Sequence, residues 1–243
     1  MNINKVSIAT ITWARTEDEE QLLKKSLEQL TKFSIPVFIT DGGSGKSFLD
    51  FLQGFPQFTI LKPRSKGLWT QVKSSLDAAY ASGSDFVLYT EPDKLEFFQN
   101  HLLSFAENIN ADELPGVILA ARSQNGFLTF PPFQRMTETT INNCCEEIIG
   151  IKTDYSYGPF ILNRMLIPYL LSVEEDIGWG WRPLAFGIVH RLDRTIQVIE
   201  KDFFCPEDQR EENAEERLHR IRQLQQNVLG ILLSQKILLA DKV

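Results

Sequence analysis

The feature that most constrains the fold is a regular alternation of short apolar runs and helix-like segments over the first half of the chain. Five apolar runs have the length of β-strands: Val6–Trp13, Val37–Thr40, Phe58–Leu61, Phe86–Thr90 and Val117–Ala121. Helix-like segments fill the intervals: Glu19–Phe33, Ser47–Leu52, Leu68–Ala81 and Glu96–Ile109. The runs are almost entirely apolar, as expected of parallel strands that helices cover on both faces. The pattern therefore predicts an α/β fold with a mostly parallel central sheet.

The second half of the chain has a different character. It is rich in Gly, Pro and aromatic residues, notably in Phe127–Phe133, Tyr155–Phe160 and Asp176–Gly187. A strand candidate lies at Thr195–Glu200, and a long C-terminal helix is predicted from apolar residues at helical spacing: Leu218, Ile221, Leu224, Val228, Ile231 and Leu232. This stripe either packs on the domain or pairs two chains as a homodimer. No linker separates the halves, so we expect a single domain over 1–243, with a first half over 1–123 and a second over 124–243.

Composition excludes several classes of protein. The chain has 243 residues, 43% of them hydrophobic, which is enough to enclose a core. A formal net charge of −7 and a pI of about 5.1 disfavour nucleic acid and anionic lipid as partners. The three cysteines, Cys144, Cys145 and Cys205, show no zinc-ligand spacing and are interpreted as reduced thiols. With no signal region and no apolar stretch of ~18 residues, we expect a cytoplasmic protein without a membrane span.

Polar residues and glycines follow the first two apolar runs. Ligands of parallel α/β sheets bind beyond the carboxyl ends of the strands, so these positions are candidates for ligand contacts. An aspartate followed by glycines can accept hydrogen bonds from a base or ribose, while the glycines let the backbone turn closely around the ligand. An ordinary Asp-Gly turn is the alternative explanation. The expected nucleotide contacts at these two strand ends are Thr10, Thr12, Arg15, Asp41 and Gly42.

A more specific pattern lies around the fourth apolar run. A helix-like segment begins at Gly67, includes Lys73 and leads through a Gly-containing turn to Phe86–Thr90, which ends in Glu91-Pro92-Asp93. Together with the Asp41-Gly42-Gly43-Ser44 loop, these residues resemble the family 2-like glycosyltransferases of the GT-A fold, in the nucleotide-diphospho-sugar transferase superfamily. In that family a helix, a short turn and an apolar strand lead to an Asp-x-Asp motif. The resemblance covers the first half of the chain closely and the second half loosely.

The resemblance implies a Rossmann-like sheet, a nucleotide-binding first half and an acceptor-side second half. It also implies that Asp93 holds Mg²⁺ or Mn²⁺ on the diphosphate of a sugar nucleotide, while Glu91 shares the metal or meets the ribose. A hard cation on carboxylate oxygens neutralises the charge that develops on the leaving diphosphate. By the same resemblance, Lys73 faces the nucleotide. The sequence departs from the family motif in its first acid, in the intervening Pro92 and in Lys94 directly afterwards, which leaves the strength of metal dependence open.

The segment Glu174–Pro183 crowds acids, glycines and indoles into ten residues. Tryptophan faces stack on the C–H faces of sugars, which makes Trp179 and Trp181 candidate sugar contacts. A nearby carboxylate can accept a proton from an attacking hydroxyl. The resemblance places the catalytic base of inverting relatives in this part of the chain, and we assign that role to Asp176, with Glu175 as the alternative. A helix end with solvated acids and buried tryptophans explains the segment equally well.

These features together predict an enzyme that transfers a hexose from a nucleoside diphosphate sugar to an acceptor, with metal assistance. A sugar nucleotidyltransferase of the same fold is a second hypothesis, disfavoured because the first strand lacks a Gly-rich basic loop for a triphosphate. A third is a GT-A-like protein that binds a nucleotide or glycan without turnover, since the acidic motif is altered. The donor sugar and base, the acceptor and the stereochemistry depend on loop conformation and stay open.

Overall fold

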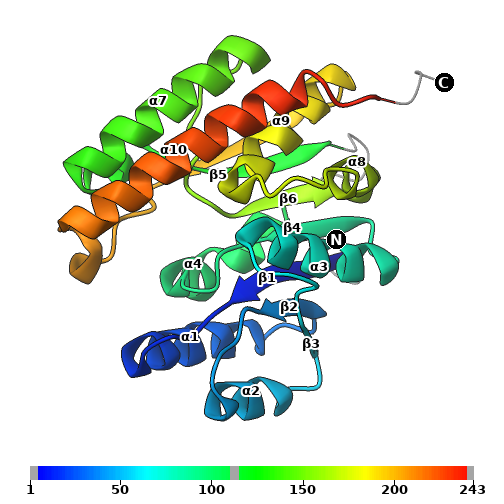
Figure 1. Cartoon of the computed structure of the whole chain (residues 1–243), viewed down its shortest axis with the longest axis vertical. Coiled ribbons are helices and arrows are strands. Elements are labelled where there is room, and N and C mark those ends of the chain that lie inside the picture. Colours follow the sequence, from blue (N-terminus) through cyan, green and yellow to red (C-terminus); the bar gives the residue numbers. More distant parts are fainter. Residues whose placement is uncertain (1–4, 110–114, 240–243) are drawn as a thin grey trace. The chain divides into compact units, whose positions relative to one another are not determined.

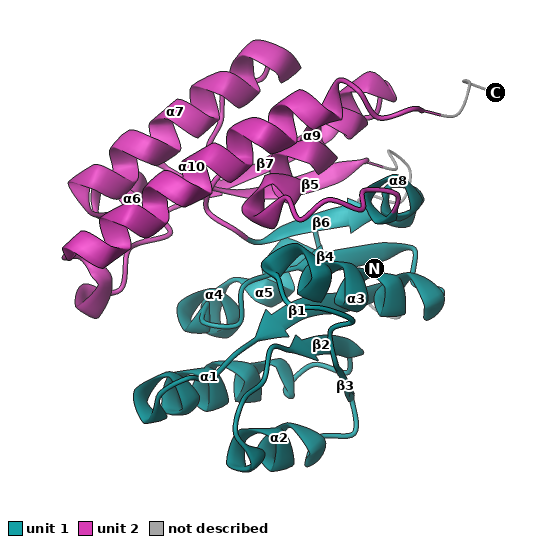
Figure 2. Ribbon diagram, in the orientation of Figure 1, with its two compact units in different colours: residues 1–114, 159–171 teal, residues 115–158, 172–243 magenta. Residues whose placement is uncertain are grey.

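The computed structural model describes residues 5–109 and 115–239, which form the elements labelled in Figure 1. The chain divides into two compact units, coloured separately in Figure 2: unit 1 comprises residues 1–114 and 159–171, and unit 2 comprises residues 115–158 and 172–243. The chain therefore leaves unit 1, returns to it for one short stretch and leaves it again. The single domain over 1–243, with halves over 1–123 and 124–243, stays a prediction.

Unit 1 contains a five-stranded sheet in the order β3-β2-β1-β4-β6. The first four pair in parallel, while β6 runs antiparallel to β4. The strands are β1 (Val6–Thr12), β2 (Val37–Asp41), β3 (Phe58–Leu61), β4 (Phe86–Tyr89) and β6 (Phe160–Asn163). The helices are α1 (Glu17–Leu30), α2 (Lys46–Gln53), α3 (Leu68–Ala81), α4 (Leu95–Asn100), α5 (Leu102–Ala106), η2 (Arg164–Leu166) and α8 (Ile167–Leu171). The α/β class and the parallel strands predicted from the apolar runs are confirmed.

Local sequence explains most of these elements. The first strand is buried along nearly its whole length, as its unbroken apolar and hydroxyl-bearing run predicts. The helix predicted to start at Gly67 does so, and it packs Trp69, Val72 and Leu76 into the core against β1 and β2. The helix predicted over Glu96–Ile109 is instead two short helices, because His101 has non-helical backbone angles and ends one while it begins the other.

Unit 2 contains a parallel pair of strands, β5 (Val117–Arg122) and β7 (Ile196–Lys201), in a register that places Arg122 opposite Lys201. Its helices are α6 (Gln124–Leu128), α7 (Pro132–Ile149), η3 (Gly178–Gly180), α9 (Trp181–Arg191), η4 (Glu207–Gln209) and α10 (Ala214–Ser234). Figure 2 shows α10 alongside α7 and α9, and it packs against both. The strand expected near Thr195–Glu200 and the long C-terminal helix are confirmed. No helix among the described residues is long and apolar enough to span a membrane.

Two close backbone contacts fix α10 in unit 2. A Cβ atom on Gly230 would lie 1.8 Å from the carbonyl oxygen of Gly180, and one on Gly180 would lie 2.1 Å from the carbonyl oxygen of Gln226. Only glycine fits at either position, because a real Cβ does not approach backbone oxygen so closely. The buried residues of α10 are accordingly small or polar, with Asn227, Gly230 and Ser234 alongside Ile231. Of the expected apolar stripe, Ile231 is thus buried, whereas Leu218, Ile221, Val228 and Leu232 are exposed.

Candidate functional site

The loop after β2 is organised by the carboxylate of Asp41. Its Oδ1 accepts hydrogen bonds from the backbone N–H groups of Gly43 (2.9 Å) and Ser44 (2.7 Å). Its Oδ2 accepts from the hydroxyls of Thr12 (2.9 Å) and Ser44 (2.6 Å). A carboxylate offers about four lone-pair positions, and these four bonds use them. The geometry thus favours a loop-shaping role for Asp41, with the loop backbone as the part presented to a ligand.

The two threonines of β1 support this edge of the sheet from inside. Both are buried, and the hydroxyl of Thr10 donates to the backbone oxygen of Thr90 at 2.7 Å. The backbone oxygen of Thr12 accepts from the N–H of Gly42 at 2.7 Å. The fold thus brings together four predicted residues at the carboxyl ends of β1 and β2: Thr10, Thr12, Asp41 and Gly42. The hydroxyls of Thr10 and Thr12 already donate hydrogen bonds within the protein.

An exposed aromatic group follows the end of β1: the indole of Trp13, which is 53% exposed. Its backbone is held in place, because the next residue, Ala14, donates its N–H to Ser44 Oγ at 2.8 Å. The guanidinium of Arg15 lies 5.5 Å from the indole centroid and also pairs with Glu19. Hydrogen bonding from Arg15 holds the pKa of Glu19 below its ordinary value. Trp13 was not among the residues predicted from the sequence, although an indole at the end of an apolar run is a usable signal.

The acidic segment Glu91-Pro92-Asp93 directly follows β4. The backbone oxygen of Asp93 accepts from Leu95 N at 2.8 Å, which starts α4. The side-chain Oδ1 of Asp93 is buried and has no hydrogen-bond partner within the described part of the chain. Burying a carboxylate oxygen without a donor costs free energy, so such an atom calls for a compensating ligand. Glu91 lies half-buried two residues before it.

These acids suit a hard divalent cation. Mg²⁺ and similar ions are commonly bound through one or two carboxylates, and the remaining positions are filled by water and substrate phosphates. Among residues 5–109 and 115–239, no group of three His, Cys, Asp or Glu side chains forms a closed metal cage. The donor set at Asp93 and Glu91 thus fits a metal that is completed by its substrate, and does not fit a structural metal.

The start of α3 lies against the Asp41 loop. A Cβ on Gly42 would be 3.0 Å from Oε1 of Gln71, so the glycine allows the helix to approach. Gly67, which begins the helix, has a φ of 131°, a value that favours glycine. The amine of Lys73 lies 6.0 Å from the centroid of the Trp69 ring, and the lysine is half-buried. The predicted residues Gly42 and Gly67 thus both shape the region where the start of α3 meets the Asp41 loop.

Of the residues predicted in the second half, the two acids are exposed. Asp176 accepts a hydrogen bond at Oδ1 from the N–H of Gly178 (3.1 Å), which forms the turn before η3. Glu175 precedes it on the surface. One Asp176 oxygen therefore supports the turn, and the exposure leaves the carboxylate accessible. Its role as a base stays a prediction.

The two tryptophans of this segment differ in exposure. Trp181 is fully buried as the first residue of α9, so no face of its ring is accessible for stacking on a sugar. Trp179 is half-buried, with the guanidinium of Arg182 5.5 Å from its ring centroid. Its N–H at Nε1 is buried without a hydrogen-bond acceptor among the described residues. Trp179 is thus the indole of this segment that remains available to a ligand.

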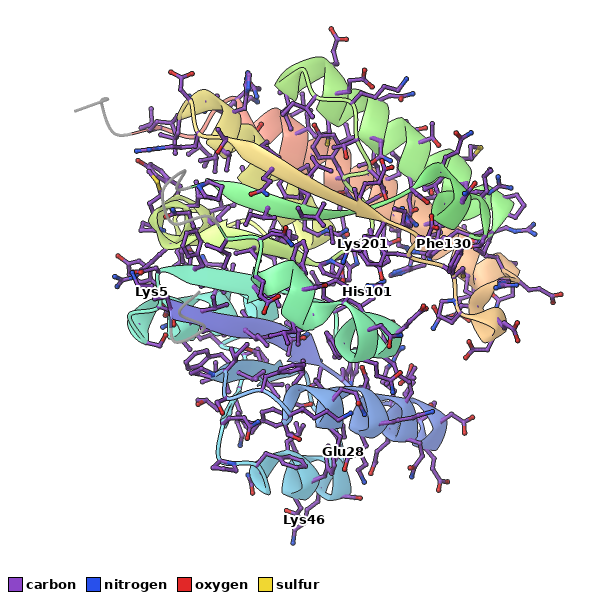
Figure 3. All side chains as sticks on the ribbon, turned by 180° about the vertical axis from the view of Figure 1, so that it is seen from behind. Lys5, Glu28, Lys46, His101, Phe130 and Lys201 are labelled. Atoms are coloured by element: carbon purple, nitrogen blue, oxygen red, sulfur yellow. The ribbon has the colours of Figure 1, made fainter. Side chains whose placement is uncertain are left out.

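A buried ionic cluster lies in unit 2 and was not predicted from the sequence. Arg122, the last residue of β5, binds Asp154 through Nε–Oδ2 at 2.7 Å and Nη2–Oδ1 at 3.0 Å. Its Nη2 also binds Glu138 Oε2 at 2.7 Å and Ser156 Oγ at 3.1 Å. The guanidinium lies 4.3 Å from the ring centroid of Phe130, labelled in Figure 3. The arginine side chain is only 1% exposed.

Charge compensation governs the titration of this cluster. Burial by itself would lower the pKa of Arg122, but Glu138 and Asp154 outweigh burial and hold that pKa above its usual value. Burial would likewise raise the pKa of Asp154, yet the charge and hydrogen bonds of Arg122 hold it well below its usual range. Arg122 and Asp154 are therefore both ionised at neutral pH. Its members lie 16 and 32 residues from Arg122, so no local pattern marks them.

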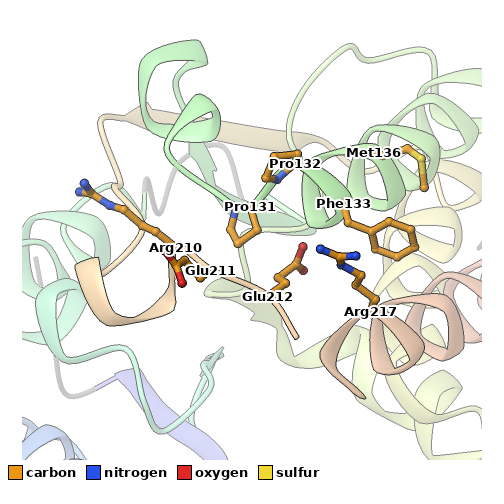
Figure 4. A pocket seen from close by; sticks show the side chains of 8 residues that line it. All are labelled: Pro131, Pro132, Phe133, Met136, Arg210, Glu211, Glu212 and Arg217. Carbon is orange, nitrogen blue, oxygen red and sulfur yellow. The ribbon is translucent and has the colours of Figure 1, made fainter. Parts of the chain in front are cut away.

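An open pocket of about 600 Å³ lies in unit 2 beside the start of α7 (Figure 4). It is lined by Pro131, Pro132, Phe133, Met136, Arg210, Glu211, Glu212 and Arg217. Glu212 accepts from the N–H of Gln134 (3.3 Å), and the Gln134 side chain donates to Glu138 (2.8 Å). Hydrogen bonds thus connect the pocket wall to the Arg122 cluster. Both signs of charge line the pocket, so it shows no preference for anions or cations.

No protein-family model and no curated protein sequence matches the chain. Solved structures do match it, and they show that the chain has the GT-A fold. One match is glucosyl-3-phosphoglycerate synthase from Mycobacterium tuberculosis in complex with uridine diphosphate, with a TM-score of 0.66 and 13% identity over 96% of this chain and 82% of that chain. These values confirm the predicted GT-A fold.

Two further matches agree with the first. The same synthase in complex with Mn²⁺, UDP-glucose and phosphoglyceric acid has a TM-score of 0.65 and 13% identity, over 96% of this chain and 81% of that chain. A structure described as a mycobacterial protein has a TM-score of 0.66 and 15% identity, over 97% of this chain and 76% of that chain. At such identities the likeness establishes the fold and leaves the chemistry to be argued from the residues.

Proposed function

We propose that this protein is a glycosyltransferase that moves a hexose from a nucleoside diphosphate sugar to an acceptor hydroxyl, assisted by Mg²⁺ or Mn²⁺. The observation that carries the proposal is the buried Oδ1 of Asp93, which follows β4 and has no hydrogen-bond partner among the described residues. In parallel α/β sheets the carboxyl ends of the strands are where ligands bind. A carboxylate oxygen that meets no donor in the described part of the chain suits a cation that arrives with its diphosphate.

Asp93 holds the metal in this proposal, and Glu91 shares it or meets the ribose. The bound cation supplies charge neutralisation for the diphosphate as the glycosidic bond breaks, without a proton transfer. Asp93 and Glu91 are placed by the hydrogen bond from Thr10 to Thr90, which ties the start of the acidic segment to β1. The acids therefore meet the diphosphate in a preorganised position, which lowers the reorganisation needed during the reaction.

The nucleoside lies, in this proposal, over the ends of β1 and β2. Trp13 offers an exposed indole face for the base, and base stacking on aromatic side chains is worth about 1–3 kcal/mol. Arg15 and Lys73 supply cations for the phosphates, and the Gly42 backbone lets the ribose approach closely. The acid–indole segment of unit 2 serves the acceptor, with Asp176 or Glu175 as the base and Trp179 as the sugar contact.

The solved relatives suggest which compounds to assay first. The M. tuberculosis synthase is described in complex with UDP-glucose and phosphoglyceric acid, so these are our first donor and acceptor candidates. We expect UDP-sugar consumption that requires Mn²⁺ or Mg²⁺ and stops with EDTA. Asp93→Asn should lower it about 10²–10³-fold, while Asp50→Asn, which changes an exposed aspartate on α2, serves as the matched control. Equal activity of Asp93→Asn and wild type would overturn the proposal.

The binding-only and nucleotidyltransferase alternatives predict other results. A protein that binds UDP with Mn²⁺ but turns over no donor in a panel of acceptors would be the non-catalytic form, which the unusual Glu-Pro-Asp motif leaves open. A nucleotidyltransferase would release pyrophosphate from a nucleoside triphosphate and a sugar phosphate. Pyrophosphate release and nucleoside diphosphate release, measured on the same preparation, separate the three hypotheses.

A further inference from the structure

The open pocket beside the start of α7 has two kinds of lining. One part of its wall is apolar and consists of Pro131, Pro132, Phe133 and Met136, of which Met136 is 55% exposed. The other part is charged and comes from the segment that leads into α10 and from its first turns: Arg210, Glu211, Glu212 and Arg217 (Figure 4). All of these residues belong to unit 2. The volume of about 600 Å³ lies in the range of small-molecule sites.

Glu212 is an enclosed acid in this wall, with a side chain that is only 5% exposed. Its Oε2 accepts a hydrogen bond at 3.3 Å from the N–H of Gln134, in the first turn of α7, whose N-cap residue Pro131 supplies no side-chain bond. Its Oε1 is buried and has no hydrogen-bond partner among the described residues. A buried acceptor without a donor costs free energy, so Oε1 calls for a donor from a ligand or a water molecule.

Arg220 stands beside this oxygen with an unused donor. Its Nη groups donate to the side-chain oxygens of Gln223 at 3.0 Å and Gln134 at 2.9 Å. Its Nε is buried without a hydrogen-bond partner in the part of the chain that the structure describes. Nε lies 3.6 Å from Oε1 of Glu212, close enough to balance the charge but too far for a hydrogen bond. The two side chains thus present one unused acceptor and one unused donor next to each other.

A hydroxyl group fits this pair of atoms, because one hydroxyl oxygen donates its own proton and accepts another. An ammonium group could donate to Glu212 but could not accept from Arg220. A carboxylate or a fully ionised phosphate could accept from Arg220 but could not donate to Glu212. The charges around the pocket also balance, since its lining includes two arginines and two glutamates. The chemistry of the site therefore favours a neutral ligand that carries hydroxyls.

The apolar wall narrows the choice of ligand further. Phe133 is half-buried, and Figure 4 shows its ring beside the side chains of Glu212 and Arg217. A sugar ring combines a C–H face, which packs on aromatic side chains, with hydroxyls along its edge. We propose that this pocket binds a neutral sugar ring, with one hydroxyl between Glu212 and Arg220 and the C–H face on Phe133. The lining includes Glu212 but not Arg220, so that hydroxyl is the deepest group of the bound sugar.

This inference goes beyond the proposed transfer reaction, in which the segment Glu174–Pro183 contacts the acceptor. The sugar site needs neither a metal nor a nucleotide, and all the contacts that support it lie within unit 2. Binding of a sugar to this pocket and transfer of a sugar from a nucleotide can therefore be measured separately.

Ligand binding to the Asp93→Asn variant tests the site, because this variant separates sugar binding from turnover. Saturation-transfer NMR with the methyl α-pyranosides of glucose, mannose and galactose should detect saturable binding of at least one of them. Adding Phe133→Ala should weaken that binding about tenfold, because the stacking surface is lost. Phe204→Ala is the matched control, since Phe204 is 42% exposed and is not part of the pocket lining, and it should leave binding unchanged.

Glu212→Gln tests the hydroxyl contact. The glutamine keeps one oxygen that can accept from Gln134 and replaces the other by an amide NH₂ group, which cannot accept from the sugar hydroxyl, so binding should weaken about tenfold. Glu28→Gln on α1 is the matched control, since Glu28 is exposed and lies in unit 1. Urea midpoints measured on the same variants report whether they fold. If Glu212→Gln unfolds, the comparison of Phe133→Ala with Phe204→Ala decides the outcome.

Three results overturn the inference. The first is no saturable binding of any of the three glycosides, and the second is tighter binding of phosphoglyceric acid than of every glycoside. The third is glycoside binding that neither Phe133→Ala nor Glu212→Gln weakens, which would place the sugar elsewhere. A glycoside that binds in this pocket of a chain without transferase activity supports the inference while it contradicts the proposed function.

Discussion

Two groups of acids, one in each unit, are buried in opposite ways. In unit 2, Asp154 and Glu138 close around Arg122, and hydrogen bonds from Arg122 and Ser156 occupy the carboxylates. In unit 1, Asp93 keeps a buried oxygen for which the described chain provides no donor. Carboxylates that are compensated inside the fold stabilise it, whereas we propose that the uncompensated one after β4 binds a ligand.

The largest effect should come from removing the central charge of the closed cluster. Arg122→Met leaves Asp154 and Glu138 buried beside each other without a counter-charge, and we expect a loss of about 3–5 kcal/mol in the free energy of unfolding. Urea denaturation monitored by circular dichroism measures it. Arg122→Lys keeps the charge but loses the forked contact, so it should lose less. A loss below about 1 kcal/mol for Arg122→Met would show that the cluster is not stabilising.

The Asp93 site should respond in the opposite way to the Arg122 cluster, with a large loss of activity and little loss of stability. Asp93→Asn should lower transfer from UDP-glucose about 10²–10³-fold, because the metal and its charge neutralisation are lost, while the urea midpoint stays near wild type. Asp154→Asn should instead lower the midpoint strongly. Measuring both quantities on both variants gives a crossed comparison. A large stability loss in Asp93→Asn would break the distinction between the two groups of acids.

Acid should weaken the closed cluster. The pKa of Asp154 is lower in the folded than in the unfolded chain, so its contribution to stability is fully present above the unfolded value of about 3.9 and is lost as the pH falls below it. We expect on the order of 2 kcal/mol from this one group. The stability difference between wild type and Asp154→Asn, measured by urea denaturation from pH 7 to pH 3, should shrink toward low pH. A difference that stays constant would contradict the ionised cluster.

The smallest effect should come from changing Trp13, the proposed contact for the base of the nucleotide. Trp13→Ala should weaken UDP binding about tenfold, and Trp13→Phe less, because a ring is kept. UDP should quench tryptophan fluorescence in wild type and in Trp179→Phe, and the quenching should disappear in Trp13→Phe. Quenching that persists in Trp13→Phe would remove Trp13 from the nucleotide site.

The comparison also explains what the sequence could predict. Strand ends and the start of α3 follow from local patterns, so Asp41, Gly67 and Asp93 were correctly placed at the ends of their elements. Arg122 and its partners meet only through the tertiary fold, and no spacing announces them. The helix α7 was not predicted; it begins at Pro132, within the Pro- and aromatic-rich stretch Phe127–Phe133.

Side-chain orientation was the second limit. Periodicity predicted the long helix α10 but left open which face is buried, and the answer came from two glycines at a backbone contact. Trp181 and Trp179 are equivalent in sequence terms, yet one is enclosed and the other is accessible. Asp41 was predicted to bind a ligand, and its four internal hydrogen bonds could be recognised only from the loop conformation.

The return of the chain to unit 1 at residues 159–171 has a consequence for biosynthesis. The strand β6 pairs with one edge of β4, and the N–H of Arg164 donates to the backbone oxygen of Asp85 beside it. During synthesis, β6 cannot pair with this edge of β4 until residues Phe160–Asn163 have left the ribosome. An apolar, open strand edge is prone to intermolecular pairing. Nascent chains stalled within 115–158, and fragments that end at 114, should therefore depend on chaperones to remain soluble.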